Sequence, residues 1–180
     1  MRKFAGFILR LMGWKIERNF PKDVEQCVIV MGPHTSNWDF IIGRLAFAWY
    51  GIQCKLLVKK DLFFPPLGWL LKSIGAIPVD RKGKNNMTEQ VAELFKKHKQ
   101  LYLVFTPEGT RKQNPNWKKG FYYIALKAQV PIYVCYMDYS NKTGGFKQRF
   151  DPTGDVDKDI EAIKSLLRPH KGKYPENGIL

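Results

Sequence analysis

An apolar run of four residues, VIVM at positions 28–31, most strongly limits how this chain can fold. β-Branched residues that end in the turn pair Gly32-Pro33 are typical of a buried strand, and the apolar periodicity of residues 40–50 is typical of a helix. The polar residues between them, 34–39, therefore lie on a turn that leads from a strand into a helix.

This turn carries a histidine and an aspartate five positions apart, His34 and Asp39. On one continuous helix their side chains would point about 140° apart and could not meet. If His34 lies in the turn and Asp39 in the first helical turn, the carboxylate can bind one imidazole nitrogen and leave the other as a base. The alternative is structural, because Ser36 and Asp39 also have the spacing of a capping box, with His34 as an ordinary surface residue.

The chain is strongly basic. Its 180 residues, 44% of them hydrophobic, are enough for one substantial core and one domain. Its 30 Lys and Arg residues outnumber 16 Asp and Glu, which gives a formal net charge of +14. Such an excess favours polyanionic partners, namely nucleic acid, an anionic bilayer or phosphorylated substrates, and does not choose among them.

Cysteine and histidine spacing gives no sign of a metal site. The three cysteines lie in apolar runs without C-x-x-C spacing: Cys27, Cys54 and Cys135. The three histidines are scattered: His34, His98 and His170. We therefore expect no bound metal, and we interpret the cysteines as small core residues in a reducing compartment.

Residues 1–14 form an amphipathic segment in which apolar side chains recur at helical spacing: Phe4, Phe7, Ile8 and Leu11. This periodicity is typical both of a helix in a bilayer interface and of a helix packed on the protein's own core, so both remain open. Arg10 interrupts the apolar run and no small-residue cleavage site follows, which argues against a signal peptide. No stretch reaches the roughly 18 apolar residues of a spanning helix.

A second apolar stretch, residues 62–71, contains the pair Pro65-Pro66, which prevents a regular helix or a central strand through its middle. It is either a buried connector or an exposed patch that faces lipid. Lysines flank it at positions 59, 60 and 72, and this favours a membrane-facing or acyl-binding role.

Two further strand-like runs deliver polar residues at their ends. Residues 75–79 lead to Asp80-Arg81, and residues 101–105 lead to the pentapeptide PEGTR at 107–111. Ligands of open α/β sheets lie beyond the carboxyl ends of strands, so the end of the 101–105 run is a candidate binding site. By itself an Asp-Arg pair is also a common local ion pair.

Elsewhere the periodicity predicts helices over 40–50, 88–97, 118–129 and 155–167. It also predicts a hairpin over 139–152 that turns at Thr143-Gly144-Gly145. In the first of these helices, the side chains expected to face the core are Phe40, Ile41, Leu45, Ala48 and Trp49.

Four motifs together resemble, in order, the signatures of the glycerolipid or lysophospholipid acyltransferase family. They are H-x-x-x-x-D at 34–39, a glycine-led run that ends in Asp80-Arg81, P-E-G-T-R at 107–111 and V-P-I at 130–132. The sequence departs from the family pattern at Pro78, where a phenylalanine is usual, and at Thr106, which replaces an aromatic residue.

The resemblance implies a single-domain glycerolipid acyltransferase-like α/β fold, with a mixed, mostly parallel sheet flanked by helices. The acyltransferase domain would span residues 15–170, between the amphipathic helix 1–14 and a loose tail at 171–180. The implied enzyme is a 1-acylglycerol-3-phosphate O-acyltransferase-like protein of phospholipid biosynthesis. It would move a fatty acyl group from an acyl carrier protein (ACP) or coenzyme A (CoA) thioester to a hydroxyl of lysophosphatidic acid or a related lysolipid.

The same resemblance assigns roles to seven residues. His34 would be the base that Asp39 orients, and Gly109 and Thr110 would supply or shape an oxyanion site. The acceptor's phosphate would be held by Arg81 and Arg111, with Glu108 orienting one of them. No metal or prosthetic group is required, and the protein would be peripheral on the cytoplasmic face of the membrane. The rival hypothesis is a non-catalytic basic module that binds nucleic acid or anionic membrane.

Overall fold

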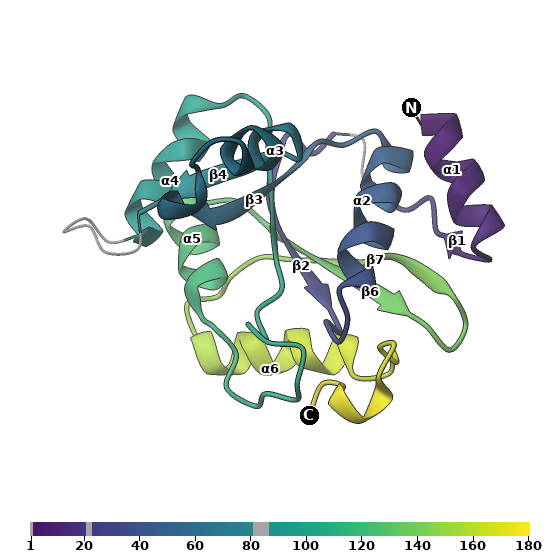
Figure 1. The fold of residues 1–180 in the computed structure, drawn as a ribbon. Coiled ribbons are helices and arrows are strands. Elements are labelled where there is room, and N and C mark those ends of the chain that lie inside the picture. The colour runs from purple at the N-terminus through teal and green to yellow at the C-terminus, as the bar shows by residue number, and fades with distance from the viewer. Residues whose placement is uncertain (1, 21–22, 81–86) are drawn as a thin grey trace.

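The computed structural model describes residues 2–20, 23–80 and 87–180 (Figure 1). Within them the strands are β1 (Lys15–Ile16), β2 (Gln26–Gly32), β3 (Cys54–Lys59), β4 (Ala76–Val79), β5 (Leu101–Phe105), β6 (Ile132–Asp138) and β7 (Thr143–Phe150). The α-helices are α1 (Arg2–Leu11), α2 (Trp38–Tyr50), α3 (Leu67–Ser73), α4 (Met87–Lys97), α5 (Gly120–Ala128) and α6 (Val156–Leu167). Short 3-10 helices lie at η1 (Lys60–Leu62) and η2 (Pro175–Asn177).

The strands form one sheet in the order β1-β7-β6-β2-β5-β3-β4. The five neighbouring strands β6, β2, β5, β3 and β4 are all parallel, whereas β7 runs antiparallel to β6. The central strand β2 is buried from Cys27 to Gly32, because both of its faces are covered. The sheet is therefore mixed and mostly parallel, and the fold class predicted from the sequence is confirmed.

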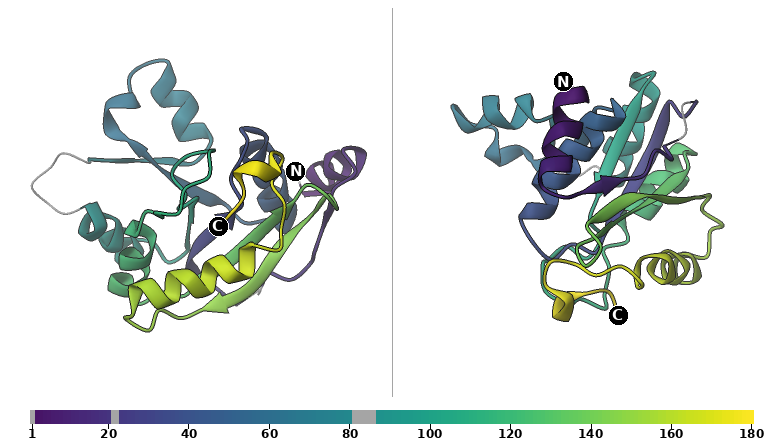
Figure 2. Two further views of the ribbon diagram at one scale, coloured as in Figure 1. Left: turned by 90° about the horizontal axis from the view of Figure 1, so that it is seen from below. Right: turned by 90° about the vertical axis from the view of Figure 1, so that its right-hand side faces the viewer.

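Alternate residues of β2 point into two separate cores. Cys27 and Ile29 pack with Ile42 of α2 on one face of the sheet. Val28 packs with Phe121 of α5 on the other face. This alternation follows from the pleat of a strand, whose successive side chains point in opposite directions. Figure 2 shows the resulting layers, with α1 and α2 on one side of the sheet and α4, α5 and α6 on the other.

The hairpin after β6 turns earlier than the sequence predicts. Its turn lies at 139–142, and both Gly144 and Gly145 are within β7. The glycines are there because β1 approaches closely. Gly144 pairs with Ile16, and a Cβ on Gly145 would lie 2.9 Å from the Cβ of Glu17. The prediction that these glycines form the turn was wrong.

The helix α2 matches the prediction in part: Leu45 and Trp49 pack against the core, but the start of the helix is turned differently. Phe40 and Ile41, expected to face the core, are 39% and 44% exposed, while Ile42 and Phe47 are buried. The reason is Asp39, which is buried and directed back into the preceding turn. Residues three, four and eight positions after it share its face of the helix, and those residues form the core contact.

The helix α1 uses a narrow face for packing and leaves its large apolar side chains in solvent. Ala5 and Leu9 are buried, whereas Phe4, Phe7 and Leu11 are 67%, 62% and 76% exposed. Gly6 permits the close approach, because a Cβ there would lie 2.5 Å from the Trp49 ring. The helix therefore packs on the core, and it also presents an apolar face outward.

Residues 62–71 correspond to the exposed alternative. The segment runs from η1 into the short helix α3, which stands out from the body of the fold (Figure 2). Its exposed apolar side chains are Leu62, Phe64, Trp69 and Leu70. Among the described residues, no helix is both long and apolar enough to cross a membrane.

The segment 168–180 is anchored to the fold at several points, although most of its residues are exposed, so the start of the predicted tail at 171–180 is not loose. The carbonyl of Lys171 accepts a hydrogen bond from the N–H of Tyr139 at 2.8 Å. The N–H of Tyr174 donates to Oγ1 of Thr35 at 3.2 Å. Gly172 fits against Thr35, where a Cβ would come within 2.5 Å. The absence of a side chain at Gly172 thus lets the segment lie directly on the turn that follows β2.

Candidate active site

The predicted site lies where three neighbouring parallel strands end. β2 lies between β6 and β5, so the turns that follow these strands open at the same edge of the sheet. In Figure 1 this edge is at the lower end of β2, beside the first turn of α2. The three turns bring together His34, Glu108 and Tyr139.

His34 and Asp39 meet as the sequence predicts. Nδ1 of His34 lies 3.0 Å from Oδ2 of Asp39, and the two side chains are 18% and 1% exposed. A carboxylate accepts hydrogen bonds, so this contact places the imidazole proton on Nδ1 and leaves Nε2 unprotonated. None of the described residues hydrogen-bonds to Nε2. The imidazole is therefore oriented as a general base requires.

The carboxylate of Asp39 also organises the turn. Its Oδ2 accepts hydrogen bonds from the backbone N–H groups of Thr35 and Ser36, both at 2.9 Å. Burial acts to raise the pKa of Asp39, but hydrogen bonds from His34, Tyr139 and Ser36 hold this pKa below its usual value. The hydroxyl of Ser36 accepts from the N–H of Trp38 at 3.2 Å. Only one of the two bonds of a capping box forms, the one from the N–H of Ser36 to Asp39, and the N-cap residue of α2 is Asn37, whose side chain makes no capping bond.

Glu108 binds the backbone of the His34 turn. The prediction that it orients one of two arginines concerns Arg81, which lies outside the described residues, as much as Arg111. Both of its carboxylate oxygens accept from the backbone N–H of His34, at 3.1 and 2.9 Å. Gly32 permits this approach, because a Cβ there would lie 3.3 Å from Oε1 of Glu108. Among the described residues Glu108 forms no ion pair with Arg111. It therefore holds the backbone of the His34 turn and does not orient this arginine.

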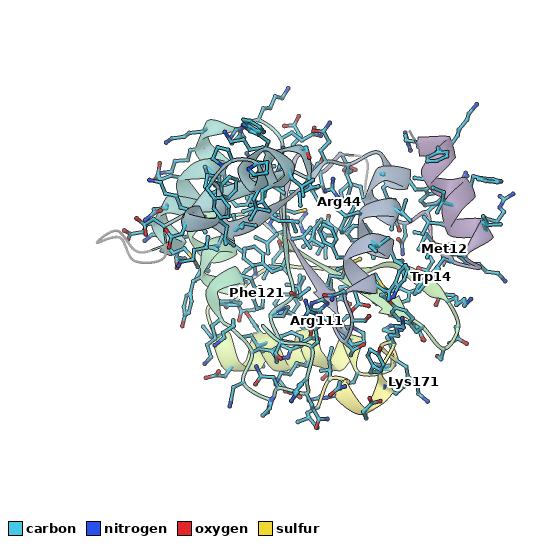
Figure 3. All side chains as sticks on the ribbon, viewed as in Figure 1. Met12, Trp14, Arg44, Arg111, Phe121 and Lys171 are labelled. Carbon is cyan, nitrogen blue, oxygen red and sulfur yellow. The ribbon has the colours of Figure 1, made fainter. Side chains whose placement is uncertain are left out.

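The rest of the PEGTR motif forms an exposed turn at the same edge. Gly109 has a φ of +68°, a conformation that favours glycine. Its N–H donates to the carbonyl of Thr106 at 3.1 Å, so it shapes the turn and is not a free oxyanion donor. Thr110 and Arg111 are exposed. Figure 3 shows Arg111 at the lower edge of the sheet, close to the end of β2. Arg81, the other predicted phosphate ligand, lies outside the described residues.

Sequence reasoning missed one member of this site. The hydroxyl of Tyr139 donates to Oδ1 of Asp39 at 2.6 Å, across 100 positions of sequence. No spacing rule connects the two residues. The one available signal was that Tyr139 follows the apolar run of β6, which ends at the same edge as β2.

Nothing in the described part of the chain forms a metal site, since no three His, Cys, Asp or Glu side chains there are grouped closely enough to hold an ion. The three cysteines are buried and unpaired, and burial raises the pKa of Cys27 and Cys135 to about 12.

Residues 14–138 match the family model described as Acyltransferase. The chain belongs to this family. The match includes His34, Asp39 and the PEGTR motif of this acyltransferase-family protein, and it ends just before Tyr139.

Two curated relatives match parts of this acyltransferase-family chain. It is 31% identical over 111 residues to human 1-acyl-sn-glycerol-3-phosphate acyltransferase beta, covering 58% of this chain and 40% of the relative. It is 29% identical over 136 residues to the 1-acyl-sn-glycerol-3-phosphate acyltransferase of Streptococcus pneumoniae, covering 71% of this chain and 50% of the relative. The matched parts thus span half or less of each relative's length.

A solved structure shares the fold. The crystal structure of the 1-acyl-sn-glycerophosphate (LPA) acyltransferase PlsC from Thermotoga maritima aligns with a TM-score of 0.65 and 16% identity, over 93% of this chain and 75% of that one. At this identity the likeness establishes the architecture alone.

Proposed function

We propose that this chain is an O-acyltransferase that moves a fatty acyl group from a thioester to a hydroxyl of lysophosphatidic acid or a related lysolipid. The observation that carries the proposal is the 3.0 Å contact between Nδ1 of His34 and Oδ2 of Asp39, in a chain of the acyltransferase family. The names of both curated relatives support the choice of acceptor.

The reaction needs a base and then an acid, and His34 supplies both. Nε2 removes the proton from the acceptor hydroxyl while the hydroxyl oxygen attacks the thioester carbonyl. Asp39 stabilises the imidazolium ion that forms. The tetrahedral intermediate then collapses, the C–S bond breaks, and the leaving thiolate takes the proton from His34. The products are an ester and a free thiol, and the imidazole returns to its starting state.

The developing oxyanion requires hydrogen-bond donors. Since the N–H of Gly109 is already bound to Thr106, we assign this role to Thr110, which is exposed at the same edge. The hydroxyl of Thr110 accepts from the N–H of Lys112 at 3.3 Å, so its own proton is free to point toward substrate.

The acceptor's phosphate would be held by Arg111, together with Arg81. Arg111 is exposed in the turn after β5, and its planar guanidinium can form two parallel hydrogen bonds with phosphate. The basic surface of the chain also suits the donor, because acyl-ACP and acyl-CoA are both acidic.

Lipid substrates also need an apolar approach to His34. Trp38, Phe40 and Ile41, all in the first turn of α2, are exposed immediately beside the His34 turn. We propose that they contact the acyl chains of bound lipid, since exposed apolar groups of this kind mark sites of lipid or protein contact.

We further propose a peripheral location on the cytoplasmic face of the membrane. The exposed apolar side chains of α1 and α3 would enter the bilayer interface, and basic residues lie beside them at Arg2, Lys3, Arg10 and Lys72. The unpaired cysteines fit a reducing compartment.

The test is to incubate the protein with acyl-CoA or acyl-ACP and a panel of lysolipids in mixed micelles, and to follow products by mass spectrometry. The expected result is an acylated lysolipid and one free thiol per ester, with lysophosphatidic acid among the acceptors. If neither donor acylates any lysolipid, and nucleic acid is bound with a steep salt dependence, the non-catalytic alternative is correct.

A further inference from the structure

Tyr139 completes the hydrogen bonding of a buried carboxylate. Asp39 is 1% exposed, so water does not solvate its charge. Oδ2 accepts hydrogen bonds from three residues of the preceding turn: His34, Thr35 and Ser36. For Oδ1, the donor found in the described structure is the hydroxyl of Tyr139, at 2.6 Å.

Tyr139 is itself held in place from several directions. Its ring packs edge-on against Trp14, with centroids 5.0 Å apart and planes at 89°. Its N–H donates to the carbonyl of Lys171 at 2.8 Å. The turn that follows is fixed by the carboxylate of Asp138, which accepts from the N–H of Ser140 at 2.9 Å. Figure 3 shows Trp14 on the side of the sheet where the β6–β7 hairpin turns. The hydroxyl therefore has a position defined independently of Asp39.

We propose that Tyr139 is a positioning residue for the His34–Asp39 pair. Its hydroxyl keeps the carboxylate turned so that Oδ2 faces Nδ1 of His34. The same hydrogen bond stabilises the negative charge of Asp39, which in turn stabilises the imidazolium ion of His34. This inference rests on the acyl transfer proposed above. Tyr139 lies just beyond residues 14–138, so it is a feature of this chain outside the part that the family model matches.

The chemistry of the phenol suits this role. Burial, and then the bond to Asp39, raise the pKa of Tyr139 far above its usual value, so the hydroxyl stays protonated and can donate. Hydrogen bonds to charged groups are stronger than those between neutral groups. A buried carboxylate oxygen that has no donor lowers the stability of the folded protein.

The test compares Tyr139→Phe with a matched control, Tyr136→Phe. Both substitutions remove one hydroxyl bound to a carboxylate, because Tyr136 donates to Oε1 of Glu17 at 2.7 Å, and among the described residues Glu17 does not hydrogen-bond to His34 or Asp39. For Tyr139→Phe we expect kcat to fall roughly ten- to a hundredfold with both KM values unchanged, since the phenol touches neither substrate. The control should keep the wild-type kcat.

A second readout does not depend on turnover. The NMR signal of the proton on Nδ1 of His34, recorded without substrate, should move or broaden in Tyr139→Phe and stay in place in Tyr136→Phe. An unchanged signal and an unchanged kcat in Tyr139→Phe would overturn the proposal. So would a kcat that falls only in step with melting temperature, equally in both variants. If the wild type transfers no acyl group, the proposed function fails, and the NMR comparison still decides whether Tyr139 positions Asp39.

Discussion

Both carboxylate oxygens of Glu108 accept a hydrogen bond from the backbone N–H of His34, at 3.1 and 2.9 Å. This contact ties the turn after β5 to the turn after β2, so the PEGTR motif and the H-x-x-x-x-D motif form one unit. Burial raises the pKa of Glu108 to about 7, although the N–H of His34 acts in the opposite direction.

The raised pKa of Glu108 predicts a loss of stability with rising pH. Between its ordinary value of 4.5 and about 7, the folded state binds this proton more tightly than the unfolded state does. Protonation of Glu108 therefore adds to the free energy of unfolding. This contribution is fully present below pH 4.5 and is lost as the pH rises through 7. It amounts to about 3 kcal/mol at most.

Urea unfolding of wild type and Glu108→Gln from pH 4.5 to 8 measures this effect. The variant should show a flatter dependence of the unfolding free energy on pH, because glutamine does not titrate. Burial also lowers the pKa of His170, but this histidine is present in both proteins, so the difference between them isolates Glu108. Identical pH dependence in the two proteins would contradict the assignment.

The close contact between Gly172 and Thr35 predicts that the segment 168–180 stabilises the turn that carries His34. A Cβ at Gly172 would lie 2.5 Å from Cγ2 of Thr35, whose N–H donates to Asp39. Gly172→Ala should therefore cost about 1 to 3 kcal/mol of stability and lower acyl transfer. Gly120→Ala is the control, since its Cβ would meet nothing closer than 3.9 Å. The measurements are the melting temperature and the initial rate of acyl transfer of each variant. Equal values for Gly172→Ala and Gly120→Ala would show that the segment 168–180 does not support the His34 turn.

The exposed faces of α1 and α3 predict binding to anionic vesicles. Removing residues 1–14 would also remove the buried Leu9 and Trp14, so single substitutions are the sharper test. Phe7→Asp and Trp69→Asp should each reduce sedimentation with vesicles, while added salt should weaken the electrostatic part alone. Tyr123→Asp, at an exposed aromatic residue of α5 on the other side of the sheet, should bind like the wild type. Equal binding by all four proteins would exclude α1 and α3 as the anchor.

Arg111 predicts the specificity for a phosphate-bearing acceptor. Arg111→Ala should raise the KM for such an acceptor by about ten- to a hundredfold, the loss of one charged hydrogen-bonding contact, with little change for the thioester. Arg149→Ala removes an equal charge from β7 and should leave both constants near wild type. Undiminished efficiency in a stable Arg111→Ala would rule out its role in binding phosphate.

The central strands and their motifs could be predicted from the sequence because fully buried strands have a distinctive composition. The runs at 28–31 and 101–105 are wholly apolar, and the polar residues after them had to lie at strand ends. The contact between His34 and Asp39 followed from the same reasoning, since only a turn allows it.

Other features depend on contacts that sequence spacing does not encode. The bond from Tyr139 to Asp39 requires β6 to lie beside β2, which the order of residues does not reveal. The partner of Glu108 is a backbone N–H, and every non-proline residue carries one. The rotation of α2 follows from the buried carboxylate of Asp39, a stronger constraint than the average hydrophobicity of the helix faces.

The central claim is that Nε2 of His34 removes the acceptor's proton, and His34→Ala tests it most directly. Asp39 keeps its bonds from Thr35, Ser36 and Tyr139 without the imidazole, so the variant should fold. His98→Ala, at an exposed histidine, is the control. The measurement is the rate of esterification of lysophosphatidic acid by a labelled thioester. We expect a loss of about a hundredfold to ten-thousandfold in His34→Ala and none in the control. A folded His34→Ala protein that retained more than about a tenth of the wild-type rate would contradict the account, because the loss of a general base is larger than that.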